Sequence, residues 1–135
     1  MRHRAILATT YGLLLCAALA KAEEHMVYII APLDGTAVQS PVLVQFGLKN
    51  PWGVAPAGTA LANTGHHHLL IDTDLPDLTQ AIPKDEHHQH FGGGQTEALV
   101  DLRPGRHTLQ LLLGDFAHVP HAPPVISERI TITVE

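Results

Sequence analysis

The stretch RHTLQLLLGD, Arg106 to Asp115, decides the fold of this chain. Leu109, Leu111 and Leu113 recur at every second residue, which is the period at which the side chains of a β-strand share one face. The turn sequence RPG precedes the stretch and the loop sequence FAHVPHAPP follows it. The segment therefore predicts a strand with one leucine-lined, buried face.

The same period of two recurs in segments before and after this strand. It occurs in VLVQFGLK, residues 42–49, and in the last stretch, SERITITVE. The chain contains only three Phe, two Tyr and one Trp, so the core must be mostly aliphatic. The predicted core residues are Val42, Val44, Phe46, Leu109, Leu111, Leu113, Ile130, Ile132 and Val134. Six or seven short strands separated by turn signals predict an all-β fold: an immunoglobulin-like antiparallel β-sandwich of about seven strands, with long histidine-rich loops.

The first 22 residues have the composition of a secretory signal peptide. A basic start, MRHR, precedes an apolar run, and Ala20 and Ala22 are the small residues that a signal peptidase requires. We therefore expect residues 1–22 to be a signal and residues 23–135 to form a single β-sandwich domain, periplasmic or secreted. No second apolar run follows, so we expect no membrane span after signal cleavage.

Cysteine content and charge exclude several classes of function for residues 23–135. The one cysteine, Cys16, lies in the predicted signal, so neither disulfides nor thiolate metal sites are expected. The remaining residues carry 13 acidic and five basic side chains, a net charge of −8 with histidine neutral. Such a surface repels phosphate backbones and attracts cations, so we expect no nucleic-acid partner.

The histidines are the feature that packing does not explain. Eleven occur in the chain, and eight of them fall into three groups: 66–68, 87–90 and 118–121. In a strand, His66 and His68 would point to the same side while His67 points away. Imidazole suits zinc, copper(II) or nickel, so clustered rings predict a metal site. The predicted metal ligands are His66, His68, His88, His90, His118 and His121.

Two further groups of residues bear on the same chemistry. Asp72 and Asp115 lie near the histidine groups in the sequence and are expected to orient their rings through the second ring nitrogen. Signal cleavage after Ala22 would also create an N-terminal copper site from Glu23, Glu24 and His25, because a free amine with histidine at the third position chelates copper(II).

Several stretches resemble the bacterial secreted family known as domain of unknown function 4399. They are FGLKNPWGVAPAG, NTGHHHLLIDTDLPDL, HQHFGGGQTEALVDLRPGRHTLQLLLGD and HVPHAPPVISERITITV, and the resemblance runs from Tyr28 to Val134. The resemblance implies no particular activity. It marks as motif positions Gly65–His68, His88, His90, Gly92–Gly94, Gln95, Glu97, His107, His118 and His121.

Two classes of function follow from these features. The first is a histidine-rich metal-binding module, a zinc or copper(II) buffer, chaperone or sensor serving an unknown periplasmic protein partner, with binding that weakens below about pH 6.5. The alternative is a non-enzymatic envelope interaction domain whose histidines are structural hydrogen-bond donors. A small metalloenzyme is a third hypothesis. The ligand spacing and the lack of a nucleophile with a base argue against an enzyme.

Overall fold

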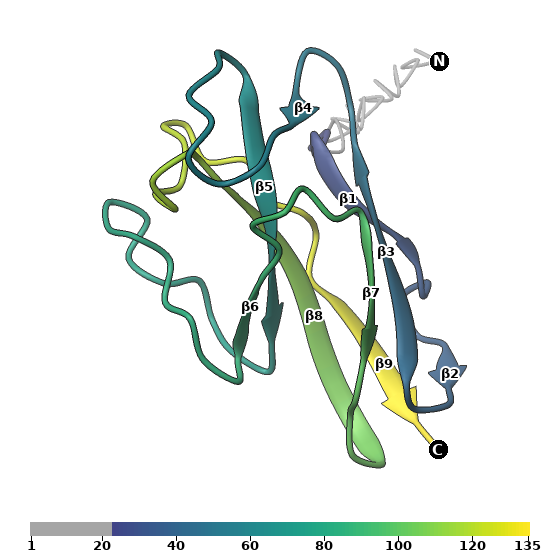
Figure 1. Cartoon of the computed structure of the whole chain (residues 1–135). Helices are drawn as coiled ribbons and strands as arrows, with labels where there is room; N and C mark the ends of the chain where they lie inside the picture. The colour runs from purple at the N-terminus through teal and green to yellow at the C-terminus, as the bar shows by residue number, and fades with distance from the viewer. Residues whose placement is uncertain (1–22) are drawn as a thin grey trace, which may run out of the picture.

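The computed structural model describes residues 23–135, which form two β-sheets and contain no helix. The predicted signal peptide, residues 1–22, lies outside the described residues. No helix long and apolar enough to cross a membrane occurs in the described range. The two sheets face each other as two layers (Figure 1).

The smaller sheet has three antiparallel strands in the order β1-β3-β7. They are β1 (Val27–Ala31), β3 (Val42–Leu48) and β7 (Glu97–Val100). Val42 and Val44 of β3 point into the molecule, while the intervening Leu43 is 45% exposed. This alternation is typical of a sheet with one buried and one solvated face.

The larger sheet has six strands, of which five follow the order β2-β9-β8-β5-β4 while β6 pairs with β5. They are β2 (Ala37–Val38), β4 (Gly53–Val54), β5 (Thr64–Ile71), β6 (His88–His90), β8 (Gly105–Gly114) and β9 (Ile130–Val134). The pairs β2–β9 and β4–β5 are parallel, whereas β5–β6, β5–β8 and β8–β9 are antiparallel. Because β5 pairs with three neighbours, it is held along most of its length.

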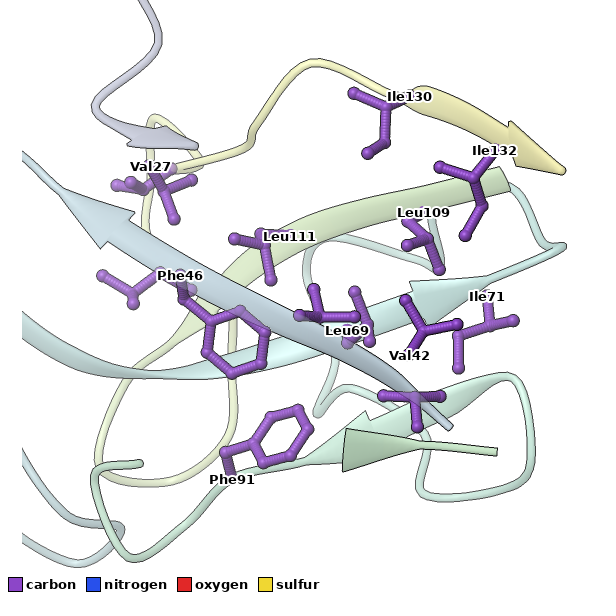
Figure 2. Close-up of a cluster of buried hydrophobic side chains, with 14 of the residues drawn as sticks. Val27, Val42, Phe46, Leu69, Ile71, Phe91, Leu109, Leu111, Ile130 and Ile132 are labelled. Atoms are coloured by element: carbon purple, nitrogen blue, oxygen red, sulfur yellow. The ribbon is translucent and has the colours of Figure 1, made fainter. Parts of the chain in front are cut away.

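One apolar core fills the space between the sheets (Figure 2). The smaller sheet contributes Val27 and Phe46, among others, and the larger sheet contributes Leu69, Leu111 and Ile132. All nine predicted core residues are buried, which confirms that prediction. The leucines of β8 at residues 109, 111 and 113 are fully buried, as their period of two requires.

The outer face of the larger sheet is buried as well. Leu70 of β5 and Leu112 of β8 form a second cluster with Ile82 from the loop between β5 and β6. This loop, residues 72–87, and the loop between β8 and β9, residues 115–129, both extend on the side away from the smaller sheet (Figure 1). Consequently β5 is covered on both faces, and seven of its eight residues are buried.

The structure confirms the all-β class but corrects its details. Nine strands are present in residues 23–135 rather than about seven, because β2, β4 and β6 are too short to show a period in the sequence. His66 to His68 lie inside β5, in agreement with the strand predicted for them, and they are buried because both faces of that strand are covered. The finer immunoglobulin-like assignment stays a prediction.

Candidate metal centre

Four imidazole rings from three separate segments meet on the outer face of the larger sheet. His66 and His68 come from β5, His90 from β6 and His118 from the loop between β8 and β9. Their ring centroids are separated by 4.7 Å (66–68), 4.9 Å (66–90), 5.0 Å (66–118), 5.1 Å (68–90), 4.6 Å (90–118) and 6.1 Å (68–118). Every ring therefore lies beside the other three.

Strand pairing explains how three of these rings converge. Side chains of β5 alternate between the two faces, so His66 and His68 point outward while His67 points into the core, where its ring lies 5.1 Å from that of Phe46. His90 is directly opposite His68 in the β5–β6 ladder. The period of two in the sequence thus places His66 and His68 on one face of the strand, as predicted.

His118 reaches the cluster from a loop that is held by backbone hydrogen bonds. Its carbonyl accepts a hydrogen bond from the amide of Ile82 (2.8 Å), and its own amide donates to the carbonyl of Asp115 (3.0 Å). The residue adopts φ +66°, in the left-handed region that non-glycine residues enter at a cost. Residue 118 is therefore a histidine at a backbone conformation that glycine would adopt with less strain.

Three of the four histidines meet the basic geometric condition for a shared ion. One ring nitrogen each from His66, His68 and His90 lie within 4.8 Å of one another. Nitrogens that bind one zinc ion at about 2 Å lie a little over 3 Å apart, so a small contraction of the three rings would complete the site. The ring of His118 lies beside these three, with centroids 4.6 to 6.1 Å away, but it is not part of the set whose nitrogens lie within 4.8 Å of one another.

Three of the four clustered histidines have buried ring nitrogens without a partner in residues 23–135, a property that they share with His67 and His121. Both nitrogens of His66, Nδ1 of His68 and Nε2 of His90 are buried and have no hydrogen-bond partner among the described residues. By contrast, Nδ1 of each of four other histidines is paired: His25 with the Ile126 carbonyl, His87 with the Ile71 carbonyl, His88 with Asp85 and His107 with Asp72. Buried polar atoms are normally satisfied, so the cluster has the donor set and the unmet need of a metal site.

Burial lowers the pKa of three of the clustered rings, those of His66, His68 and His90, and so keeps them neutral. It lowers the pKa of His66 to about 4, with the nearby His90 and His118 acting in the same direction and Asp115 opposing them. Burial, together with His66 and His90, lowers the pKa of His68 to about 3. Burial and His118 also lower the pKa of His90. A neutral imidazole is the form that coordinates metal, so the rings are ready to bind at neutral pH.

Two glycines make room for the rings. A Cβ atom at Gly114 would lie 2.6 Å from Cε1 of His68, and one at Gly92 would collide with the ring of His90. Real Cβ atoms do not approach other atoms this closely, so only glycine fits at either position without moving an imidazole. Gly92 begins the GGG run, whose function is therefore to accommodate His90 rather than to give general flexibility.

A cavity of about 110 Å³ opens beside the cluster. It is lined by His68, Ile82, Pro83, Lys84, His90 and His118. Three of the four rings, those of His68, His90 and His118, are therefore reachable by a small molecule from the side of residues 82–84.

Two predicted ligands lie outside the cluster. The Nδ1–H group of His88 donates a hydrogen bond to Asp85 Oδ1 (2.8 Å), because the turn before β6 brings the two residues together. The ring of His121 lies 4.6 Å from that of Trp52, and its Nε2 atom is buried without a partner among residues 23–135. His121 is therefore not among the four rings that meet at the cluster.

The predicted supporting residues are also distributed differently. Both oxygens of Asp72 are engaged at the far end of β5, with His107 Nδ1 (2.6 Å) and the Thr108 amide (2.8 Å), because Asp72 follows the last residue of the strand. Asp115 Oδ1 accepts from the amides of Ala117 and Val119, so it fixes the loop of His118 rather than a ring.

At the N-terminal end of the described range, the His25 ring is held by a backbone carbonyl. Its Nδ1 atom, which an N-terminal copper site would need, lies 2.9 Å from the oxygen of Ile126. Glu23 and Glu24 lie beside it on the surface. Copper binding by these three residues stays a prediction, and it would require His25 to leave this hydrogen bond.

Sequence reasoning missed Gly114, Ile82 and Lys84. Gly114 ends the LQLLLG run, where a glycine after three leucines signals only a strand end. Ile82 and Lys84 belong to a loop of mixed composition, and nothing in their local sequence signals that this loop lies over β5. Gly92, by contrast, is one of the motif positions that the family resemblance marks.

Comparison with known proteins identifies the family. No curated protein and no solved structure matches the chain. The family model described as Domain of unknown function (DUF4399) matches residues 44–135, which include all four clustered histidines and both glycines beneath them. This confirms the resemblance found in the sequence. The chain belongs to the DUF4399 family.

Proposed function

We propose that this protein is an exported metal-binding module, periplasmic or secreted, that holds one divalent cation on His66, His68, His90 and His118. The observation that carries the proposal is the contrast between the two kinds of histidine. His25, His87, His88 and His107 are hydrogen-bonded to protein atoms, whereas His66, His68 and His90 present buried nitrogens without partners among the described residues and lie close to one another. His67 and His121 also have unpartnered buried nitrogens within this range, but their rings pack against Phe46 and Trp52. A cation would satisfy one nitrogen of each ring at once.

The ring separations favour zinc over copper(II). In a tetrahedral four-histidine site, a metal–nitrogen distance of about 2 Å places the ring centres about 5 Å apart in all six pairs. A square-planar site would instead place two opposite pairs more than about 6 Å apart. Five pairs lie between 4.6 and 5.1 Å, and only the His68–His118 pair reaches 6.1 Å. These distances support a slightly opened tetrahedron.

The surface charge fits the same function. Residues 23–135 carry 13 acidic and five basic side chains, so the protein concentrates cations around itself. A buffer, chaperone or sensor of metal would use this property, and each would exchange the ion with an unknown partner protein. The four rings provide no nucleophile, and we propose binding rather than catalysis.

The alternative, an envelope interaction domain, has one observation in its favour. The outer face of the smaller sheet exposes Leu43 and Leu99, which are paired across β3 and β7 and are 45% and 69% exposed. Tyr28 and Ile30 of β1 are exposed in the same sheet. This face lies on the opposite layer from the histidines, so protein binding there and metal binding at the cluster are compatible.

Calorimetric titration tests the proposal. The purified protein is titrated with zinc and with copper(II), beside a His90→Gln/His118→Gln variant and a His87→Ala control, whose ring lies outside the cluster. We expect one zinc per chain, binding at least about tenfold weaker in the double variant, and unchanged binding in the control. Thermal unfolding of all three proteins checks that each is folded. Equal zinc binding by the double variant and the control would refute the proposed site.

A further inference from the structure

Lys84 occupies an unexpected place for a basic residue in an acidic protein. It is one of five Lys or Arg side chains in residues 23–135, yet it lines the cavity beside His68, His90 and His118. No carboxylate lines this cavity, although residues 23–135 contain 13 acidic side chains. The arrangement is the reverse of what a site for a cation alone would need.

A metal ion bound beside Lys84 would lack a compensating negative charge. Four imidazoles are neutral ligands, so a bound divalent ion keeps its full charge in a partly buried site. The exposed Lys84 adds a further positive charge at the edge of the same cavity, where it repels a bound cation and attracts anions. An anion between the two would neutralise both, which makes the combination of metal and lysine favourable instead of costly.

The geometry gives this anion a way to the metal. The widest separation within the cluster, 6.1 Å, is between His68 and His118. Both rings line the cavity, so the open side of the four-histidine arrangement faces Lys84. The volume of about 110 Å³ corresponds to about three to four water molecules at liquid density, which is enough for a small anion and too little for an organic ligand of ordinary size.

We propose that the cavity binds a small inorganic anion, held between Lys84 and the metal ion on the four histidines. This inference rests on the proposed function, because it requires the metal. It also gives the ion an exchangeable ligand position: Ile82 and Pro83 form an apolar wall, and the lysine selects for negative charge among the small molecules that fit.

Azide serves as the probe. The full-length protein is loaded with zinc, its metal content is measured by elemental analysis, and azide is added in a calorimetric titration. The same protein loaded with cobalt(II) reports coordination through its visible spectrum, which changes when a four-coordinate ion gains or exchanges a ligand. The variants are Lys84→Gln, Lys84→Arg, which keeps the charge, and Lys49→Gln, a surface control that lies elsewhere, beside Glu24.

Lys84→Gln is expected to weaken azide binding without weakening zinc binding. Lys84→Gln should bind azide weaker by a factor on the order of five, while its zinc affinity stays the same or rises, because a repelling charge has been removed. Lys84→Arg and Lys49→Gln should match the unaltered protein in both. If zinc binds but azide does not, or if azide binds Lys84→Gln as tightly as it binds the control, the anion site is wrong and the metal site stands. If no metal binds, both proposals are wrong.

Discussion

His68 lies directly against the backbone of Gly114, so closely that a methyl group on residue 114 would be 2.6 Å from Cε1 of the ring. The contact joins two neighbouring strands, β5 and β8, on the face that carries the histidine cluster. It means that the position of this imidazole depends on the absence of a side chain on the adjacent strand.

Replacing this glycine should therefore disturb the site. Gly114→Ala is expected to displace the His68 ring, to reduce the free energy of unfolding by about 1–3 kcal/mol through overpacking, and to weaken zinc binding. Urea unfolding and calorimetric zinc titration measure the two effects. Gly53→Ala is the matched control, because a Cβ atom there meets nothing closer than 3.8 Å. Equal behaviour of the two variants would contradict the packing argument.

Replacing His118 should relieve backbone strain but remove a metal ligand. His118→Gly relieves the left-handed φ of +66° but loses the imidazole. We expect the free energy of unfolding to change by less than about 1 kcal/mol, since relief in the folded state is offset by extra freedom in the unfolded chain. Zinc affinity should fall at least about tenfold. His118→Asn tolerates the same φ, so retained zinc affinity in that variant would show that the ring is not a ligand.

The metal-free protein should lose stability in mild acid. The folded pKa values of His66 and His67 are about 4 and that of His68 is about 3, whereas unfolded histidine titrates near 6.5. Above about pH 6.5 both states are neutral and stability is full. Between about pH 6.5 and 4 the unfolded chain binds protons that the folded chain does not bind, so the free energy of unfolding falls as pH falls.

Urea unfolding of the metal-free protein at several pH values measures this slope. Each of the three histidines contributes up to about 1.4 kcal/mol per pH unit within the window. His67→Leu removes one of them without touching the cluster and should flatten the curve while leaving zinc binding nearly unchanged. A curve that is level from neutral pH down to about pH 5 would show that these rings are not held neutral by the fold.

Zinc binding should persist at a lower pH than ordinary histidine chemistry allows. The sequence alone suggests release below about pH 6.5, the usual pKa of histidine. Since burial lowers the pKa of His66, His68 and His90, protons compete with the metal only under more acidic conditions. Equilibrium dialysis against zinc is therefore expected to show little loss at about pH 5.5. Half-release near pH 6.5 would mean that the ligands are exposed histidines elsewhere.

The pair of His107 and Asp72 should affect stability and not metal binding. Burial lowers the pKa of His107, but hydrogen bonds with Asp72 and the Arg103 carbonyl outweigh it, so the net pKa is raised. The stabilisation is thus present below about pH 6.5 and is lost as pH rises through the folded pKa. Asp72→Asn should cost about 1 kcal/mol at pH 6 and much less at pH 9, with unchanged zinc affinity. Weaker zinc binding in this variant would show that Asp72 does contribute to the metal site.

The parts of this fold that local patterning governs could be predicted from the sequence. The period of two in Leu109, Leu111 and Leu113 placed the central strand and its buried face, and the same period put His66 and His68 on one side of their strand with His67 on the other. The short strand β6 could not be predicted, because three residues are too few to show a period. Its pairing with β5 is what places His90 opposite His68.

The sequence by itself determined that this chain forms β-strands with an aliphatic core and carries more histidine than packing requires, since strand periodicity and composition are local properties. Only the tertiary structure decided which histidines meet. His88 and His121 have the same local signals as His90 and His118, yet strand register and loop anchoring direct the first two to Asp85 and Trp52 and the other two to the cluster. Convergence of rings from distant segments depends on strand pairing, and no local pattern in the chain specifies it.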